Sequence, residues 1–120
     1  MNIGDLNRQL RGHTIVLELV FRPDITSGVC TLSIDLAEEN TKGASVVRVQ
    51  FSGVTGLSLR EFGGGLTHLM CLSVEDVSDR QWDRVAYSVT ELEDESIAFL
   101  CREVNIPTRY VLGVGTPPHA

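Results

Sequence analysis

Hydrophobic and polar residues alternate along much of this chain, and a period of two predicts β-strands. The clearest case is residues 29–36, where Cys30, Leu32, Ile34 and Leu36 alternate with Thr31, Ser33 and Asp35. Such a pattern is typical of an antiparallel strand with one face in the core and one in water. Residues 13–22 and 45–52 are also predicted strands, although the second face of residues 13–22 holds Val16, Glu18 and Val20 and is only partly polar. Their predicted inward faces are Ile15, Leu17, Leu19 and Phe21 in the first, and Val47, Val49 and Phe51 in the second.

Between these segments the pattern predicts shorter elements. Residues 2–11 have the spacing of a short helix, with Asn2 as its N-cap. Leu57 and Leu59 indicate a short strand. Residues 66–77 fit either a strand or a helix, and we favour a strand because the neighbouring segments are strands. Residues 78–82 then predict one helical turn with Ser78 as its N-cap.

Residues 82–104 predict a β-hairpin around an acidic turn, Glu91-Leu92-Glu93-Asp94-Glu95-Ser96. The alternating residues of the two arms are expected to face the core, namely Val85, Tyr87 and Val89, then Ile97, Phe99 and Cys101. The second arm is apolar on both sides, which indicates a central strand. Pro107 is expected to end the regular region, with residues 110–112 packing back as an edge strand or turn.

These elements predict a mainly β fold, an antiparallel meander that forms a sandwich or a half-open barrel of six or seven strands, with one short N-terminal helix at most. We expect one domain over residues 1–112 and a C-terminal tail over residues 113–120. The chain has no apolar run of membrane-spanning length, and its first residues, MNIGDLNRQLRG, lack the apolar core of a secretory signal. We therefore expect a cytoplasmic protein that does not bind membranes.

The negative charge is concentrated in one half of the sequence. Residues 1–60 contain six acidic and six basic residues, whereas residues 61–120 contain ten acidic and four basic ones. Eight of the acids lie between Glu75 and Glu95. An acidic surface disfavours nucleic acids and anionic lipids as partners and favours a basic protein.

Residues that could carry catalysis or bind a metal do not form a recognisable motif. The three cysteines, Cys30, Cys71 and Cys101, are far apart and are expected to be free thiols with structural roles. The histidines are isolated, the acidic turn lacks the spacing of an EF-hand, and the three glycines at residues 63–65 lack the context of a phosphate-binding loop. We therefore expect no cofactor, no metal and no enzymatic activity.

Residues 76–106, DVSDRQWDRVAYSVTELEDESIAFLCREVNI, resemble the C-terminal part of small β-rich bacterial domains of uncharacterised or immunity-protein type. The shared pattern is an Asp/Ser/Trp connection, a Tyr-x-Val arm, an acidic turn and a Phe-x-Cys arm, and it covers about a quarter of the chain. The resemblance implies a protein that neutralises a co-encoded toxin. It carries no catalytic residue.

We therefore predict a non-enzymatic protein-binding domain, an immunity protein that masks a basic toxin surface. Its predicted contact residues are acidic: Asp76, Asp79, Asp83, Glu91, Glu93, Asp94 and Glu95. Two alternatives stay open, a structural or homo-oligomeric assembly module that uses an exposed strand edge and a small enzyme or ligand-binding β-barrel that uses His68 or Cys71. The sequence leaves open whether the acids before and within the hairpin form one patch.

Overall fold

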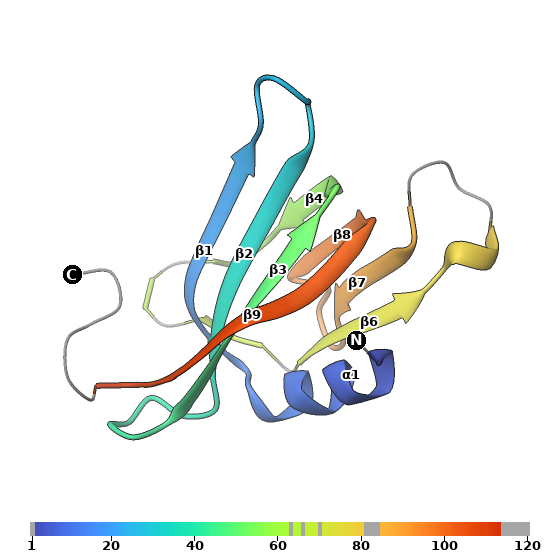
Figure 1. Ribbon diagram of the computed structural model, residues 1–120. Helices are drawn as coiled ribbons and strands as arrows, with labels where there is room; N and C mark the ends of the chain where they lie inside the picture. The colour runs from blue at the N-terminus through green and yellow to red at the C-terminus, as the bar shows by residue number, and fades with distance from the viewer. Residues whose placement is uncertain (1, 63, 66, 70, 81–84, 114–120) are drawn as a thin grey trace.

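Two antiparallel sheets and one helix make up the computed structural model, which describes residues 2–62, 64–65, 67–69, 71–80 and 85–113 (Figure 1). The larger sheet has the strand order β5-β1-β2-β3-β9 and the smaller sheet the order β4-β8-β7-β6. The strands are β1 (Ile15–Pro23), β2 (Cys30–Ala37), β3 (Ser45–Ser52), β4 (Thr55–Leu59), β5 (Thr67–His68), β6 (Leu72–Asp76), β7 (Tyr87–Glu91), β8 (Ile97–Cys101) and β9 (Glu103–Val111).

The predicted fold class is confirmed, because the two sheets form an open sandwich with one N-terminal helix. The described residues contain nine strands instead of six or seven. Residues 66–77 were expected to form a single strand, but they contribute β5 to one sheet and β6 to the other. The chain also departs from a simple meander, since β9 follows β8 but returns to the larger sheet beside β3. Residues 114–120 lie outside the described part, so the predicted tail stays a prediction.

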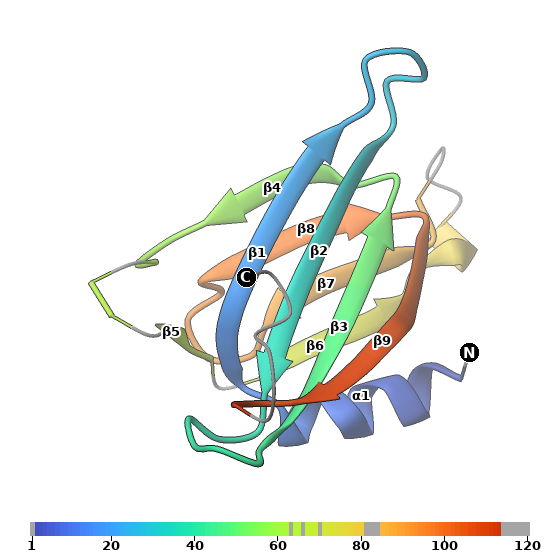
Figure 2. The ribbon, with the colours of Figure 1, turned by 60° about the vertical axis from the view of Figure 1, so that its left-hand side comes forward.

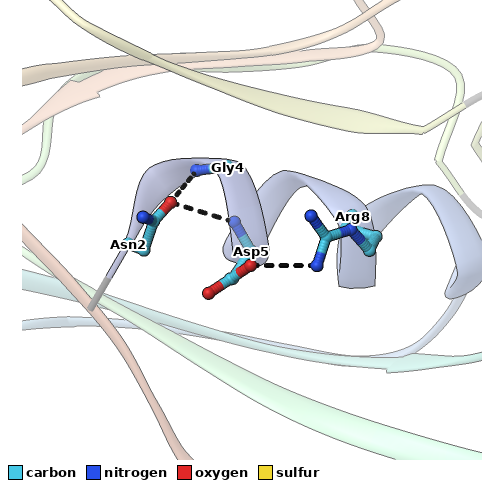
Figure 3. A network of polar contacts seen from close by, with 4 residues as sticks. All are labelled: Asn2, Gly4, Asp5 and Arg8. Atoms are coloured by element: carbon cyan, nitrogen blue, oxygen red, sulfur yellow. Dashed lines mark hydrogen bonds and ion pairs between the residues drawn. The ribbon is translucent and has the colours of Figure 1, made fainter.

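Helix α1 (Ile3–Gly12) begins where the sequence predicted it to begin (Figure 3). The Asn2 side-chain oxygen accepts hydrogen bonds from the backbone N–H groups of Gly4 at 2.7 Å and Asp5 at 3.2 Å. These are donors that the first turn of a helix leaves without partners. One turn later, the Arg8 guanidinium lies 2.9 Å from the Asp5 carboxylate. The helix is thus fixed at its start by its own side chains.

The same helix covers the outer edge of the smaller sheet. Leu6 and Leu10 are fully buried in the core. Between them, the Asn7 amide donates to the backbone oxygen of Val74 at 2.9 Å, and its carbonyl accepts from the Val74 N–H at 2.8 Å. The Asn7 side-chain amide therefore pairs with the backbone of Val74 as a residue of a neighbouring strand would. An edge that is covered in this way is protected from pairing with another chain.

Strict alternation predicted that Ile15, Leu17, Leu19 and Phe21 of β1 share one face, but a β-bulge divides them between the two faces of the strand. The pairing with β2 shifts register between Val16 and Glu18. Ile15 lies before the bulge and Leu17 lies within it. Both pack in a small second cluster with Ala37 and Val46, on the outer side of the larger sheet. Leu19 packs against the main core. One extra residue in a strand is enough to move its neighbours to the opposite face.

Pro107 does not end the regular region, as the sequence had predicted. It lies inside β9, which continues to Val111. The pairing of β9 with β3 shifts register between Arg48 and Gln50, opposite this part of β9. A proline lacks the N–H that a central strand needs, but it is tolerated in an edge strand and at a bulge. The predicted edge position of residues 110–112 is confirmed, because β9 is the last strand of its sheet.

The predicted hairpin is present as β7 and β8, with Tyr87 opposite Cys101 and Val89 opposite Phe99. Val89, Ile97, Phe99 and Cys101 are buried in the core and Tyr87 packs against it, whereas Val85 precedes β7 and is not part of the core cluster. Phe99 packs edge-to-face against Phe51 with 4.8 Å between ring centroids. The central position of the second arm is also confirmed, since β8 lies between β4 and β7. The core of the sandwich therefore depends on the arms of this hairpin.

Candidate partner-binding surfaces

The first candidate surface is the acidic turn (residues 92–96), which joins β7 to β8. Glu91 was predicted to be one of its solvated carboxylates, but this residue is only 3% exposed. Its carboxylate accepts hydrogen bonds from the backbone N–H of Asp94 at 2.7 Å and of Ser96 at 3.4 Å. Glu91 therefore shapes the turn from inside and presents no charge to a partner.

The remaining acids of the turn, Glu93, Asp94 and Glu95, are exposed. Arg60 holds the turn from the neighbouring strand end: its guanidinium donates to the backbone oxygen of Asp94, and its N–H donates to the backbone oxygen of Ser96 at 2.8 Å. Glu95 adopts a φ of 51°, in the left-handed region that L-residues rarely occupy. The three carboxylates are thus displayed on an ordered turn.

The second acidic group lies at the end of β6 and in the following 3₁₀ turn (Ser78–Arg80). It consists of Glu75, Asp76 and Asp79, all exposed. The turn was predicted with Ser78 as its cap, but Asp76 holds it instead: its carboxylate accepts from the Ser78 hydroxyl at 2.6 Å and from the Ser78 N–H at 2.9 Å. These hydrogen bonds lower the pKa of Asp76, the hydroxyl contributing most. Asp83 lies outside the described residues.

The two acidic groups do not form one patch. In the β6–β7 pair, Leu72 lies opposite Glu91 and Asp76 lies opposite Tyr87. The acidic turn therefore lies at one end of this pair and the second group at the other. At about 3.3 Å per residue, the four intervening steps separate them by roughly 13 Å along the strand. A partner that contacts both groups must span the edge of the smaller sheet.

The larger sheet carries a buried ion pair that the sequence did not reveal. Asp35 was predicted to face solvent, but it is 2% exposed. Its two carboxylate oxygens accept from Nε of Arg48 at 2.7 Å and from Nη2 at 2.9 Å, and the Tyr110 hydroxyl donates to it at 2.6 Å. Burial, with the hydrogen bond to Asp35, raises the pKa of Tyr110. The relevant signal is the register, which places Asp35 opposite Arg48 on adjacent strands.

The ion pair lies at one end of an open groove of about 340 Å³ on the outer face of the larger sheet. Strands β1, β2, β3 and β9 supply its floor. Most of its lining side chains are polar; they include Glu18, Arg22, Thr31, Ser33, Arg48 and Gln50. A polar concave sheet face of this kind offers hydrogen bonds to a protein partner.

The cysteines take structural positions in the described fold. All three are free thiols; Cys71 and Cys101 are buried, and Cys30 is half-buried. Burial raises the pKa of the Cys101 thiol to about 12 and also raises that of Cys71. A thiol that stays protonated is a poor nucleophile. Cys71 lines a hollow of about 90 Å³, and within the described ranges no three His, Cys, Asp or Glu side chains are grouped as a metal site would require.

Comparisons with known proteins identify the family of this chain. In the part of the chain that the structure describes, no helix has the length and apolar character needed to cross a membrane. Searches of curated proteins and of solved structures gave no match. The model of the family Immunity protein PIM8 matches residues 6–106. The predicted relationship to immunity proteins thus extends far beyond residues 76–106, and the chain belongs to the Immunity protein PIM8 family.

Proposed function

We propose that this protein binds a cognate toxin through a basic surface of the toxin and that the acidic turn guides the two proteins together. Membership in an immunity-protein family implies a toxin-neutralising role and a toxin protein as partner. The specific support for an electrostatic contribution is the acidic turn, where Glu93, Asp94 and Glu95 project from a backbone that Glu91 and Arg60 hold in place.

Charge at such a site acts mainly on the rate of encounter. An ordered cluster of like charges produces a local potential that draws an oppositely charged surface toward it, and this effect weakens as salt is added. Exposed charges at the rim of an interface change the association rate more than the dissociation rate. Neutralisation then follows from binding, with no catalytic step by this chain.

The second acidic group is a separate candidate contact, because it lies at the other end of the β6–β7 pair. Within it, Asp79 is the best residue to test, since Asp76 is occupied by hydrogen bonds to Ser78. Asp79→Lys therefore changes charge without removing a known contact of the turn. A partner that spans both ends of the pair would respond to Asp79→Lys as well as to changes in the acidic turn.

The test uses the purified cognate toxin domain, mixed with the chain in a stopped-flow instrument. Reversal of Glu93, Asp94 and Glu95 to Lys is expected to lower the association rate about tenfold at low salt, with a smaller difference at high salt. The matched control reverses three exposed acids away from the acidic turn, Asp5, Glu39 and Glu103, and so changes the net charge equally.

Equal rates for the two triple variants would show that only net charge matters and would remove the acidic turn from the account. An absence of binding by the unaltered chain would overturn the proposed function itself.

A further inference from the structure

The hairpin of β1 and β2 extends beyond the rest of the sandwich (Figures 1 and 2). Pairing between β2 and β3 ends at Thr31 and Ser52, one residue before the β1–β2 pairing ends at Pro23 and Cys30, and the Val54 N–H still donates to the Cys30 backbone oxygen at 3.0 Å. The turn of residues 24–29 continues beyond this point. We call residues 21–29 the apolar hairpin tip. Its exposed hydrophobic residues are Phe21 (43% exposed), Ile25 (99%) and Val29 (38%).

The turn at this tip is held by hydrogen bonds within itself. The Asp24 carboxylate accepts from the N–H groups of Thr26 at 2.8 Å and Ser27 at 3.3 Å. The Gly28 N–H donates to the backbone oxygen of Asp24 at 2.7 Å, and the Val29 N–H donates to the Ser27 hydroxyl at 3.2 Å. Gly28 has a φ of 75°, which a residue with a side chain would adopt only with strain. The tip is therefore pre-organised.

Ile25 has no role in the folded domain that would account for an apolar side chain. At 99% exposure it lies outside the packing of the core, and the hydrogen bonds of the turn involve the backbone around it instead of its side chain. Phe21 is opposite Leu32, which is fully buried, yet Phe21 itself is 43% exposed. The apolar face of the hairpin thus continues past the core.

Building on the proposed function, we propose that the apolar hairpin tip is the anchor of the toxin interface and inserts into an apolar pocket of the toxin, with Ile25 at its end. Rigid apolar residues that become fully buried on binding contribute much of the affinity of protein interfaces, because little conformational freedom is lost when they dock. The polar groove of the larger sheet adjoins the tip through Arg22 and Thr31. An apolar anchor beside a polar border is the usual arrangement of such interfaces.

A second copy of this chain fits the tip less well than a different protein does. The groove of about 340 Å³ is lined mainly by polar side chains. A smaller hollow of about 120 Å³ is lined in part by Gly28, Val29 and Cys30 and also by Arg102, a charged side chain. A convex apolar tip requires a concave apolar site, and a toxin is the partner that the family provides.

The test compares Ile25→Ser with the unaltered chain, using the cognate toxin domain and measuring Kd by calorimetry and dissociation by stopped flow. We expect Kd to rise about 10- to 100-fold, chiefly through faster dissociation. Phe21→Ser is expected to have a smaller effect, because Phe21 is already partly covered. The control is Val111→Ser, which removes an exposed apolar residue (49% exposed) from β9 and should leave Kd unchanged.

Three results would overturn the proposal, and they are distinguishable. If the unaltered chain binds and Ile25→Ser binds equally well, the tip is not the anchor, although the proposed function stands. If the unaltered chain does not bind, both proposals fail. If light scattering shows a dimer that Ile25→Ser converts to a monomer, the tip binds a second copy instead of the toxin.

Discussion

The turns of two hairpins, β1–β2 and β7–β8, are held by the same kind of hydrogen bond, but one exposes an apolar side chain and the other exposes carboxylates. In each, a carboxylate accepts backbone N–H groups and fixes the turn: Asp24 in the first and Glu91 in the second. Asp24 lies in solvent, whereas Glu91 is buried at the end of its strand. The first turn displays an isolated isoleucine, Ile25, and the second displays three carboxylates.

In both turns, the residue that stabilises the backbone is different from the residues whose side chains are exposed to a partner. The residues that hold each turn leave its displayed side chains free to vary without loss of the fold. Charge acts over about 10 Å in dilute salt and so affects how often two proteins meet. Apolar contact acts only after water is expelled and so affects how long they stay together. The two ends therefore suit successive stages of one binding event.

The largest effect is expected from Asp35→Ala, in the strand that carries the apolar hairpin tip. The change leaves the Arg48 guanidinium and the Tyr110 hydroxyl without their shared acceptor. Because Arg48 keeps partial contact with water, we expect a loss near the lower end of the range for broken buried pairs, about 3 kcal/mol in the free energy of unfolding. Urea unfolding measures it, with Ser33→Ala on the same face as the control. A loss equal to that of the control would mean that the larger sheet does not depend on this pair.

A smaller loss is expected from Glu91→Ala, which removes the internal support of the acidic turn. The N–H groups of Asp94 and Ser96 lose their acceptor, and the free energy of unfolding should fall by about 2 kcal/mol. Glu91→Gln retains a side-chain carbonyl and should lose less. The amide resonances of Asp94 and Ser96 report the geometry of the turn directly. Unshifted resonances in Glu91→Ala would show that the turn is ordered by other contacts.

Protonation of Asp24 at low pH should destabilise the turn of the apolar hairpin tip, because it weakens the hydrogen bonds that the carboxylate accepts. Hydrogen bonds from the backbone of Thr26, then of Ser27, lower its pKa below the ordinary value of 3.8. The folded state therefore favours the charged form, so the stabilisation is present above the unfolded-state pKa and is lost as pH falls through the lower folded-state pKa. Asp24→Asn should be less stable than the parent at a pH of about 6, with a gap that narrows toward a pH of about 2.5. A difference in the free energy of unfolding that does not change with pH would contradict a stabilising role for the Asp24 carboxylate.

The smallest effects on stability are expected from the displayed residues themselves. Ile25→Ser and Glu93→Lys should each change the free energy of unfolding by less than about 0.5 kcal/mol, because both side chains are exposed. Differential scanning calorimetry at equal protein concentration measures both. A clear decrease in the free energy of unfolding of either variant would show that the replaced side chain stabilises the fold and does not serve only as an exposed contact residue.

Much of the fold could be predicted from local patterns. Alternation identified the main core residues of β2 and of the β7–β8 hairpin, although it placed Asp35 in solvent, and Asn2 marked the start of α1. The errors arose where one residue changes the period or where pairing partners decide the outcome. The bulge between Val16 and Glu18 is invisible to a rule of strict alternation. Pro107 ends a strand only if that strand is central, and sequence alone does not state which strands are at an edge.

The candidate surfaces were only partly predictable, for a related reason. The acids of the acidic turn are contiguous in sequence, so their charge was evident, but the burial of Glu91 follows from its place in β7. Asp35 and Arg48 form their pair across a loop whose length sets the register. Ile25 resembles any apolar residue in a turn until the structure shows how far its hairpin reaches beyond the smaller sheet.

The most direct test of this account is a single stopped-flow comparison of two variants with the cognate toxin domain. The account predicts that reversal of Glu93, Asp94 and Glu95 to Lys slows association and leaves dissociation nearly unchanged, whereas Ile25→Ser accelerates dissociation and leaves association nearly unchanged. The opposite assignment, or rates for both variants that equal those of the unaltered chain, would contradict the division of roles between the two hairpin ends.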